Sequence, residues 1–272
     1  MIDALAKYLN YDGILKYKDE TVLSIPQIHA WSYYATIEIR YTQESLLFAK
    51  EAWSELIRKT GTLGIEIPTL LQTQQRLERE VIRTVTQNDE EEGILRVSIY
   101  PDQHYSIELF LVKTKFWELK KEGGWTKVLK YPDIINLPYW YRHNNVWPTY
   151  KKIHLETGYN TILVQDDHDL IVESTDGGFF FIEKKKVFYV GKPLYTNAIS
   201  HYVIENYNTN GKVEVLSSVT SERIHKADEL FILDNAHGLR WILAMDQRRY
   251  FSITSKNIYQ WLYQQFSENQ TV

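Results

Sequence analysis

The stretch TILVQDDHDLIVESTDGGFFFIEKKKVFYV, residues 161–190, decides the fold. Its apolar, β-branched and aromatic residues fall into short runs, and polar turns separate these runs. Runs of this length and composition are typical of strands in a compact sheet. We expect four strands here, over residues 161–164, 170–173, 179–183 and 187–190.

Helical patterns flank these strands on both sides. A helix centred on Tyr150 and Ile153 precedes them and is stopped by Gly158. After the strands, the spacing predicts helices over 198–207 and over 256–266. Thr254 and Ser255 are the expected caps of the last helix, because their side chains can accept from free amides at a helix start.

The first part of the chain has the same mixed character. A strand is predicted over 33–41, a helix from Ser45 towards Gly61 and Gly64, a second helix after Pro68, and a hairpin over 94–100 and 105–114. The charged, glycine-bearing stretch 115–124 is the expected linker. The sequence therefore predicts an α+β chain with an N-terminal domain over 1–117 and a C-terminal domain over 122–272.

Composition excludes several classes of protein. The 272 residues carry 31 Lys plus Arg against 35 Asp plus Glu, and no long basic block offers a surface for nucleic acid. The longest apolar run, 241–245, is far shorter than the roughly 18 residues that cross a bilayer. No secretory signal is visible, so a cytoplasmic location is the expectation. Without cysteine there is no disulfide, no thiolate chemistry and no Cys-ligated metal, whereas His and carboxylate chemistry stays open. We expect no metal site, because the acidic run 166–169 falls in a polar turn between two predicted strands.

Three motifs carry a resemblance to a known family. They are ESTDGGFF at 173–180, ADELFI at 227–232 and NAHGLRWI at 235–242, and the spacing between them agrees with that family. The chain resembles the fold-type IV pyridoxal phosphate enzymes, which include the class IV aminotransferases and the 4-amino-4-deoxychorismate lyases. The resemblance implies the two-domain, D-amino acid aminotransferase-like fold, a homodimer and pyridoxal phosphate as the cofactor.

The family's central residue is a lysine that forms a Schiff base with the cofactor. In the stretch RHNNVWP, aligned on Asn145 and Pro148, Arg142 stands at the lysine's place. A guanidinium stays protonated and cannot form an aldimine. Lys151 and Lys152 are the nearest lysines, about two to three turns further along the predicted helix, and they could replace it only through a shifted alignment.

The resemblance implies further cofactor contacts. Glu173 matches the carboxylate that faces the pyridine nitrogen. The family's phosphate-binding arginine falls on Glu55, and Arg58 is the possible substitute one turn away. The remaining matched positions are the helix start at Asn197 and Ala198, where backbone amides could hold a phosphate, and the turn at Asn235 and Ala236.

Three hypotheses follow for the function. The first is a degenerate relative, a pseudoenzyme that keeps the fold, has lost the covalent step, and binds a small anionic ligand or acts as a subunit partner. The second is a working lyase or aminotransferase that uses Lys151 or Lys152. The third is an unrelated, non-catalytic protein that binds small molecules. We favour the first, because Arg142 cannot supply the amine chemistry and the third ignores the matched spacings.

Overall fold

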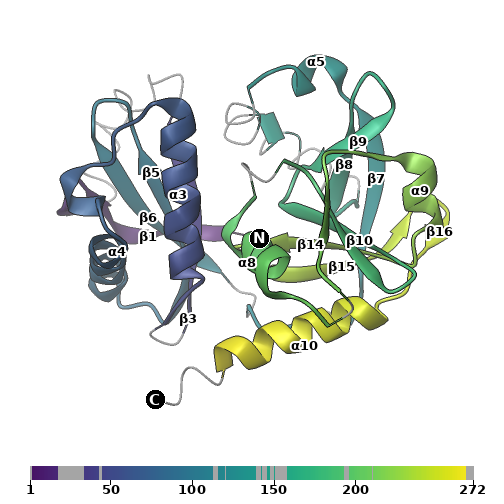
Figure 1. The fold of residues 1–272 in the computed structure, drawn as a ribbon. Coiled ribbons are helices and arrows are strands. Elements are labelled where there is room, and N and C mark those ends of the chain that lie inside the picture. Colours follow the sequence, from purple (N-terminus) through teal and green to yellow (C-terminus); the bar gives the residue numbers. More distant parts are fainter. Residues whose placement is uncertain are drawn as a thin grey trace. The chain divides into compact units, whose positions relative to one another are not determined.

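The computed structural model describes residues 2–17, 34–42, 45–112, 116–119, 121–138, 142, 146–147, 150, 158–192, 196–209 and 211–267. The chain folds as two compact units, Met1–Phe116 and Trp117–Val272. Both units combine a β-sheet with helices, as Figure 1 shows. The observed class is therefore α+β, as predicted.

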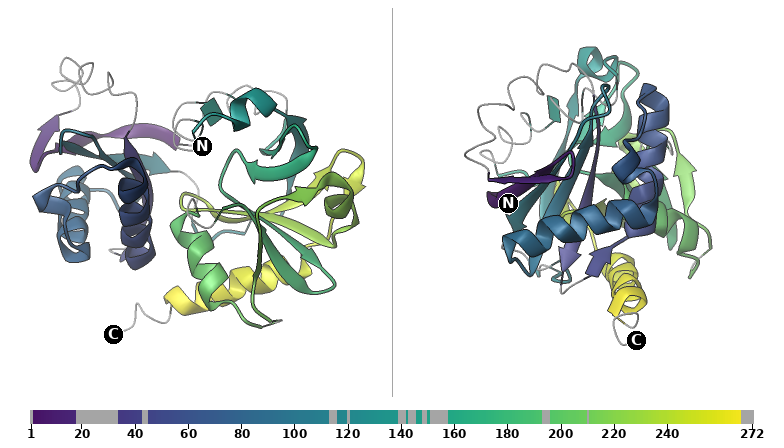
Figure 2. Two further views of the ribbon diagram at one scale, coloured as in Figure 1. Left: turned by 45° about the horizontal axis from the view of Figure 1, so that its top comes forward. Right: turned by 90° about the vertical axis from the view of Figure 1, so that its left-hand side faces the viewer.

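The first unit is built on a six-stranded antiparallel sheet with the strand order β2-β1-β6-β5-β3-β4. Helices α3 (Ala49–Leu63) and α4 (Gln74–Asn88) pack on the sheet and lie on one of its faces (Figure 2), and the short 3-10 helix η1 (Thr69–Leu71) precedes α4. The strands are β1 (Ile2–Tyr11), β2 (Ile14–Tyr17), β3 (Ala35–Thr42), β4 (Ser45–Leu47), β5 (Glu92–Ile99) and β6 (Tyr105–Val112).

The start of α3 differs from the prediction. Ser45 does not begin a helix, because residues Ser45–Leu47 pair with β3 as the edge strand β4. The helix starts at Ala49 and ends where Gly64 adopts a left-handed conformation with φ 66°. Glycine reaches this conformation without a Cβ clash, so the predicted stop at Gly64 is confirmed, whereas Gly61 lies inside the helix.

The second unit is built on a ten-stranded mixed sheet, ordered β12-β11-β10-β14-β15-β7-β8-β9-β13, with β16 paired to β15. Helices α5 (Pro132–Ile135), α8 (Ala198–Asn206), α9 (Ser221–Lys226) and α10 (Ile253–Ser267) complete the unit. The strands are β7 (Gly124–Lys130), β8 (Thr161–Gln165), β9 (Leu170–Ser174), β10 (Gly178–Glu183), β11 (Lys186–Val190), β12 (Glu214–Leu216), β13 (Val219–Thr220), β14 (Glu229–Asp234), β15 (Gly238–Met245) and β16 (Arg248–Arg249).

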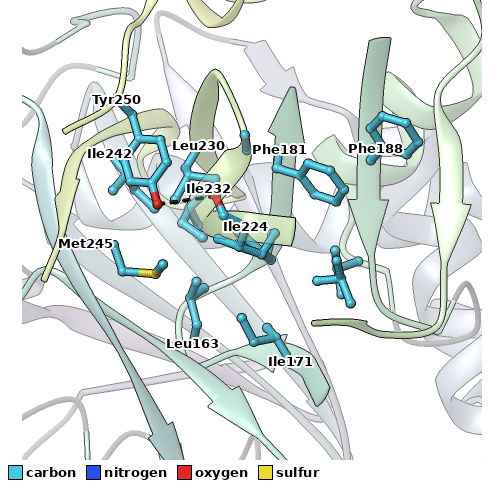
Figure 3. Close-up of a cluster of buried hydrophobic side chains, with 14 residues drawn as sticks. Leu163, Ile171, Phe181, Phe188, Ile224, Leu230, Ile232, Ile242, Met245 and Tyr250 are labelled. Atoms are coloured by element: carbon cyan, nitrogen blue, oxygen red, sulfur yellow. Dashed lines mark hydrogen bonds between the residues drawn. The ribbon is translucent and has the colours of Figure 1, made fainter. Parts of the chain in front are cut away.

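The four strands predicted over 161–190 are confirmed, and their buried side chains pack with those of α9, β14 and β15 in the core of the second unit (Figure 3). Phe181 on β10 stacks on Phe188 of β11 with ring centroids 4.7 Å apart. Lys184 and Lys185 form the turn between these two strands, both with positive φ. Burial of these two aromatic side chains contributes to the stability of the sheet.

The start of α10 depends on a buried carboxylate. Glu229, 3 % exposed, accepts from the amides of Thr254 (2.6 Å) and Ser255 (2.9 Å) and from the Ser255 hydroxyl (2.8 Å). Free amides at a helix start attract negative charge. Thr254 and Ser255 are thus residues of the helix and donors to its cap, not the caps that the sequence predicted.

Several elements were not predicted. Strands β1, β2 and β7 had no assignment, and the helix predicted around Tyr150 and Ile153 falls mainly on residues 148–149 and 151–157, outside the described residues. The hairpin of β5 and β6 is confirmed. Within the described ranges, no helix is long and apolar enough for a membrane span.

Candidate functional site

Glu173 lies on β9, next to an irregularity of the sheet. It pairs with Val164 of β8, and the following pair joins Gln165 to Ile171, so Val172 has no partner in the register. An extra residue of this kind is a β-bulge, which bends the strand and redirects nearby side chains. The Glu173 side chain is 12 % exposed, and its carboxylate lies among donors from a distant segment of the chain.

The main donor is Arg142. Its Nε lies 2.9 Å from Glu173 Oε1 and its Nη2 lies 2.9 Å from Glu173 Oε2. This two-pronged contact between a planar guanidinium and a carboxylate is the strongest form of side-chain ion pair. Nη1 donates to the carbonyl oxygens of Ile135 (2.7 Å) and Leu137. Arg142 thus joins the segment that follows α5 to the sheet.

A third donor atom, after Nε and Nη2 of Arg142, reaches Glu173 from Trp147. Trp147 donates from its indole Nε1 to Glu173 Oε1 over 2.9 Å, and the residue is only 1 % exposed. Its ring packs beside Tyr131 and Tyr150, with centroids 6.1 Å away in both cases. Burial, with a smaller effect of Tyr150, raises the pKa of Tyr131. Arg142, Trp147 and Glu173 are called the Glu173 cluster below.

The described residues of the Glu173 cluster do not fit a pyridoxal phosphate ring. Arg142 offers no primary amine for a Schiff base. Both oxygens of Glu173, which the resemblance assigns to the ring nitrogen, already accept from Arg142 or Trp147. Lys151 and Lys152 lie outside the described residues. The Glu173 cluster therefore supplies neither an attachment point for the cofactor nor a carboxylate ready to face its ring.

Of the other predicted cofactor-binding residues, Asn197, Ala198 and Asn235 lie together at the start of α8. The Asn197 side chain caps the helix, because its Oδ1 accepts from Ser200 N at 2.9 Å and its Nδ2 donates to Leu233 O at 2.8 Å. Asn235 Oδ1 accepts from Ile199 N at 3.1 Å. Two amides of the first helical turn therefore already donate to side chains of the protein.

Ala198 and Ala236 contribute backbone to the same region. Ala198 is the first residue of α8 and is buried, and Ala236 donates its amide to Asp234 Oδ1 over 2.9 Å. Arg58 lies on α3 of the first unit, where Glu55 pairs with Lys59 at 2.7 Å. The structure thus gathers the predicted residues of the second unit around α8 and the end of β14.

Two glycines bring ESTDGGFF against this region. A Cβ on Gly177 would lie 2.5 Å from Leu233 O, and one on Gly178 would lie 2.1 Å from Ser200 Oγ. Neither position has room for a side chain. Ser174 Oγ donates to Gly177 O over 2.6 Å and fixes the turn. The segment that carries Glu173 therefore packs directly on β14 and α8.

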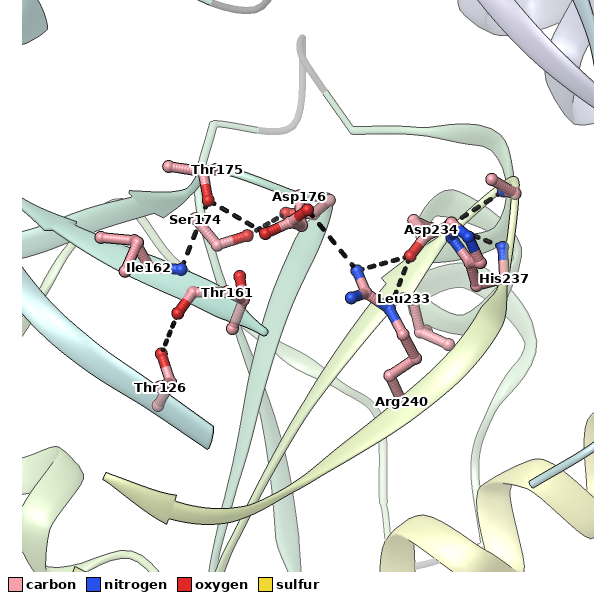
Figure 4. A network of polar contacts seen from close by, with 12 residues as sticks. Thr126, Thr161, Ile162, Ser174, Thr175, Asp176, Leu233, Asp234, His237 and Arg240 are labelled. Carbon is pink, nitrogen blue, oxygen red and sulfur yellow. Dashed lines mark hydrogen bonds and ion pairs between the residues drawn. The ribbon is translucent and has the colours of Figure 1, made fainter. Parts of the chain in front are cut away.

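A polar network that the sequence did not single out lies beside this turn (Figure 4). Arg240 Nε and Nη2 lie 2.9 and 2.7 Å from Asp234 Oδ2, and Nη2 lies 4.0 Å from Asp176 Oδ1. Burial disfavours the charged guanidinium, but both carboxylates outweigh it, so the pKa of Arg240 is raised. His237 donates its amide to Asp234 Oδ1 over 2.7 Å. The network ties β14, β15 and the turn before β10 together.

Comparison with known proteins identifies the fold. No protein-family model and no curated protein sequence matches the chain. The branched-chain amino acid aminotransferase of T.th., complexed with N-(5'-phosphopyridoxyl)-L-glutamate, matches with a TM-score of 0.77 and 15% identity, covering 95% of this chain and 93% of that chain. The Escherichia coli branched-chain amino acid aminotransferase matches with a TM-score of 0.74 and 12% identity, covering 96% and 94%.

A third match is an aminotransferase from Brucella abortus bound to the co-factor PLP, with a TM-score of 0.75 and 15% identity, covering 97% of this chain and 99% of that chain. TM-scores of 0.74 to 0.77 establish the fold, and identities of 12% to 15% leave the activity open. The predicted fold is confirmed: this chain has the two-domain fold of the class IV aminotransferases, the fold-type IV pyridoxal phosphate enzymes.

Proposed function

We propose that this chain is a pseudoenzyme of the class IV aminotransferase fold, which has lost the covalent step of the aminotransferases and lyases. The observation that carries the proposal is the pairing of Arg142 with Glu173. An arginine at the lysine's place cannot attack an aldehyde, and its charge is used to hold the carboxylate that would face the cofactor's ring. The site supports binding or assembly, with no bond made to a substrate.

The same proposal includes the state and the partners of the protein. We expect a cytoplasmic homodimer that binds a small anionic ligand, and neither nucleic acid nor a membrane. Arg142 itself is a poor receptor for an anion, since its donors are engaged with Glu173, Ile135 and Leu137. Sedimentation velocity of the purified chain measures whether two copies associate.

A spectrum tests the loss of the covalent step. The purified protein is expected to be colourless and, after incubation with pyridoxal phosphate and borohydride, to carry no reduced adduct on Lys151 or Lys152 above the labelling of its exposed lysines on tryptic mapping. An adduct on Lys151 or Lys152 would support the working enzyme instead. Because surface lysines react weakly with the aldehyde, an adduct is specific only if it exceeds the labelling of exposed lysines such as Lys184 and Lys185. The variant Lys151→Arg/Lys152→Arg must in addition lose the aldimine absorbance of the parent chain.

Arg142→Lys is the complementary variant. It places an amine at the aligned position, next to the described partner Glu173. If the alignment is right and the phosphate contacts persist, this variant gains the near-ultraviolet or visible absorbance of an aldimine, which borohydride removes. The parent chain under the same conditions supplies the baseline.

A further inference from the structure

The attachment of Arg142 shows how closely Glu173 is held. The guanidinium is planar, and its Nε and Nη2 edge faces the carboxylate while Nη1 faces two backbone carbonyls. The side chains of Arg142 and Glu173 are only 10 % and 12 % exposed. Charged groups so little exposed to water need a partner, and Arg142 is the cation that pairs with Glu173. A second planar cation could therefore bind Glu173 in this way only by displacing the guanidinium.

The surroundings favour one kind of occupant. Glu173 Oε1 is held by the Trp147 indole, which fixes the carboxylate, and the aromatic rings of Trp147, Tyr131 and Tyr150 lie next to one another. A fixed carboxylate recognises a flat cation with two parallel N–H donors better than a compact ammonium ion. The chain meets this requirement with its own arginine, from a segment 31 residues away.

We infer that Glu173 and Trp147 form a binding site for a planar, cationic nitrogen donor, and that Arg142 is its built-in occupant. The inference rests on the proposed function, because the guanidinium takes the place at Glu173 that the resemblance gives to the cofactor's protonated ring nitrogen. Removing the Arg142 side chain opens the site to a free cation of the same chemistry. In the unmodified chain, the Arg142 guanidinium holds the fold together at this point in place of a cofactor.

Chemical rescue of Arg142→Ala by guanidinium chloride is the test. The substitution removes this cation from Glu173, and we expect a fall in melting temperature on the order of 10 °C. Millimolar guanidinium, far below the concentrations that unfold proteins, is expected to raise that melting temperature by several degrees, since a ligand of the folded state stabilises it. Sodium chloride at equal ionic strength should not.

The control variant is Arg142→Ala/Glu173→Gln, which lacks the carboxylate that would bind the cation. We expect no response of its melting temperature to guanidinium. The indole N–H resonance of Trp147, assigned with Trp147→Phe, should shift on titration of Arg142→Ala and not of the double variant. An equal response of both variants, or no response of Arg142→Ala, overturns the inference.

A second cycle serves if Arg142→Ala does not fold. Arg142→Met, Glu173→Met and the double variant are compared by thermal unfolding, and the double variant should lose less than the sum of the single losses, because both charges of the pair are removed together. Additive losses overturn the inference. A specific pyridoxal phosphate adduct in the unmodified chain would refute the proposed function, whereas a failed rescue of folded Arg142→Ala, with no such adduct in the unmodified chain, would refute this inference alone.

Discussion

Two glutamates from two motifs of the same resemblance do different work in the second unit. Glu229 accepts from two backbone amides and a hydroxyl at the start of α10, all within 254–255. Glu173 accepts from the side chains of Arg142 and Trp147, which reach it from another segment. Glu229 thus completes a helix, whereas Glu173 holds Arg142 and Trp147 on the sheet.

The difference shows what a motif can and cannot tell. Asp228, beside Glu229, accepts from the amide of Lys184 at 2.8 Å and fixes the turn between β10 and β11. The stretch ADELFI therefore serves the architecture of the unit, and its presence says nothing about catalysis. The residues around Glu173 also match the family's motif. The partner of its carboxylate, Arg142, lies elsewhere in the chain and determines the chemistry of the site.

The largest effect is expected from Glu229→Ala. Removing the carboxylate leaves the amides of Thr254 and Ser255 buried without this acceptor, and hydrogen bonds to charged groups are worth about 1.5–3 kcal/mol each. We expect a loss of about 4 kcal/mol in the free energy of unfolding, measured by urea denaturation. Glu222→Ala, at an exposed ion pair with Lys226, is the control and should leave the midpoint unchanged. Equal effects would refute the assigned cap.

Glu173→Gln is expected to cost less, about 3 kcal/mol, because it leaves the little-exposed Arg142 guanidinium without a charged partner while the amide oxygen can still accept from Arg142 or Trp147. Arg142 also keeps the carbonyl oxygens of Ile135 and Leu137. The measurement is urea denaturation beside Glu229→Gln, whose new amide group would face backbone donors. If Glu173→Gln proves the more destabilising of the two, the contrast between the two glutamates is wrong.

Much of the fold could be predicted from local patterns, and the site only in part. The strands of 161–190 follow from short apolar runs between polar turns. Strand β7 was missed, since the predicted linker ran up to its first residue, Gly124, and its pairing with β8 and β15 is parallel and non-local. Alignment placed Arg142 at the lysine position. Its contact with Glu173 depends on the bulge in β9 and on a separation of 31 residues, which no local pattern encodes.

The effect of alkaline pH on stability can be compared between the two units, because each contains a buried tyrosine with a raised pKa. Burial raises the pKa of Tyr100 in the first unit and of Tyr250 in the second to about 12, with the Ser106 hydroxyl opposing the shift at Tyr100 and Arg248 opposing it at Tyr250. Between pH 10 and 12 the unfolded chain ionises these groups first, so the free energy of unfolding falls as the pH rises.

Melting temperatures from pH 8 to 11 check this prediction. Tyr100→Phe and Tyr250→Phe should each flatten the decline, and by similar amounts, because burial raises both pKa values to about 12. Tyr263→Phe, at an exposed ring, is the control and should keep the slope of the parent chain. If neither Tyr100→Phe nor Tyr250→Phe changes the slope of the melting temperature against pH, other groups control alkaline unfolding.

The smallest expected effect is a difference in stability loss between two helix caps, one at the candidate site and one in the first unit. Thr73 accepts from Arg76 N at the start of α4, and its loss in Thr73→Ala should cost about 1 kcal/mol. Asn197→Ala removes the same kind of cap from α8 and also the bond to Leu233 O, so we expect about 1.5 kcal/mol in urea denaturation. Asn197→Asp keeps the acceptor for Ser200 N but places an oxygen opposite Leu233 O, where Nδ2 donated, so it should recover only part of the loss. If the two alanine variants lose equal stability, the bond to Leu233 contributes nothing and Asn197 is an ordinary cap, since that second contact is what distinguishes it from Thr73.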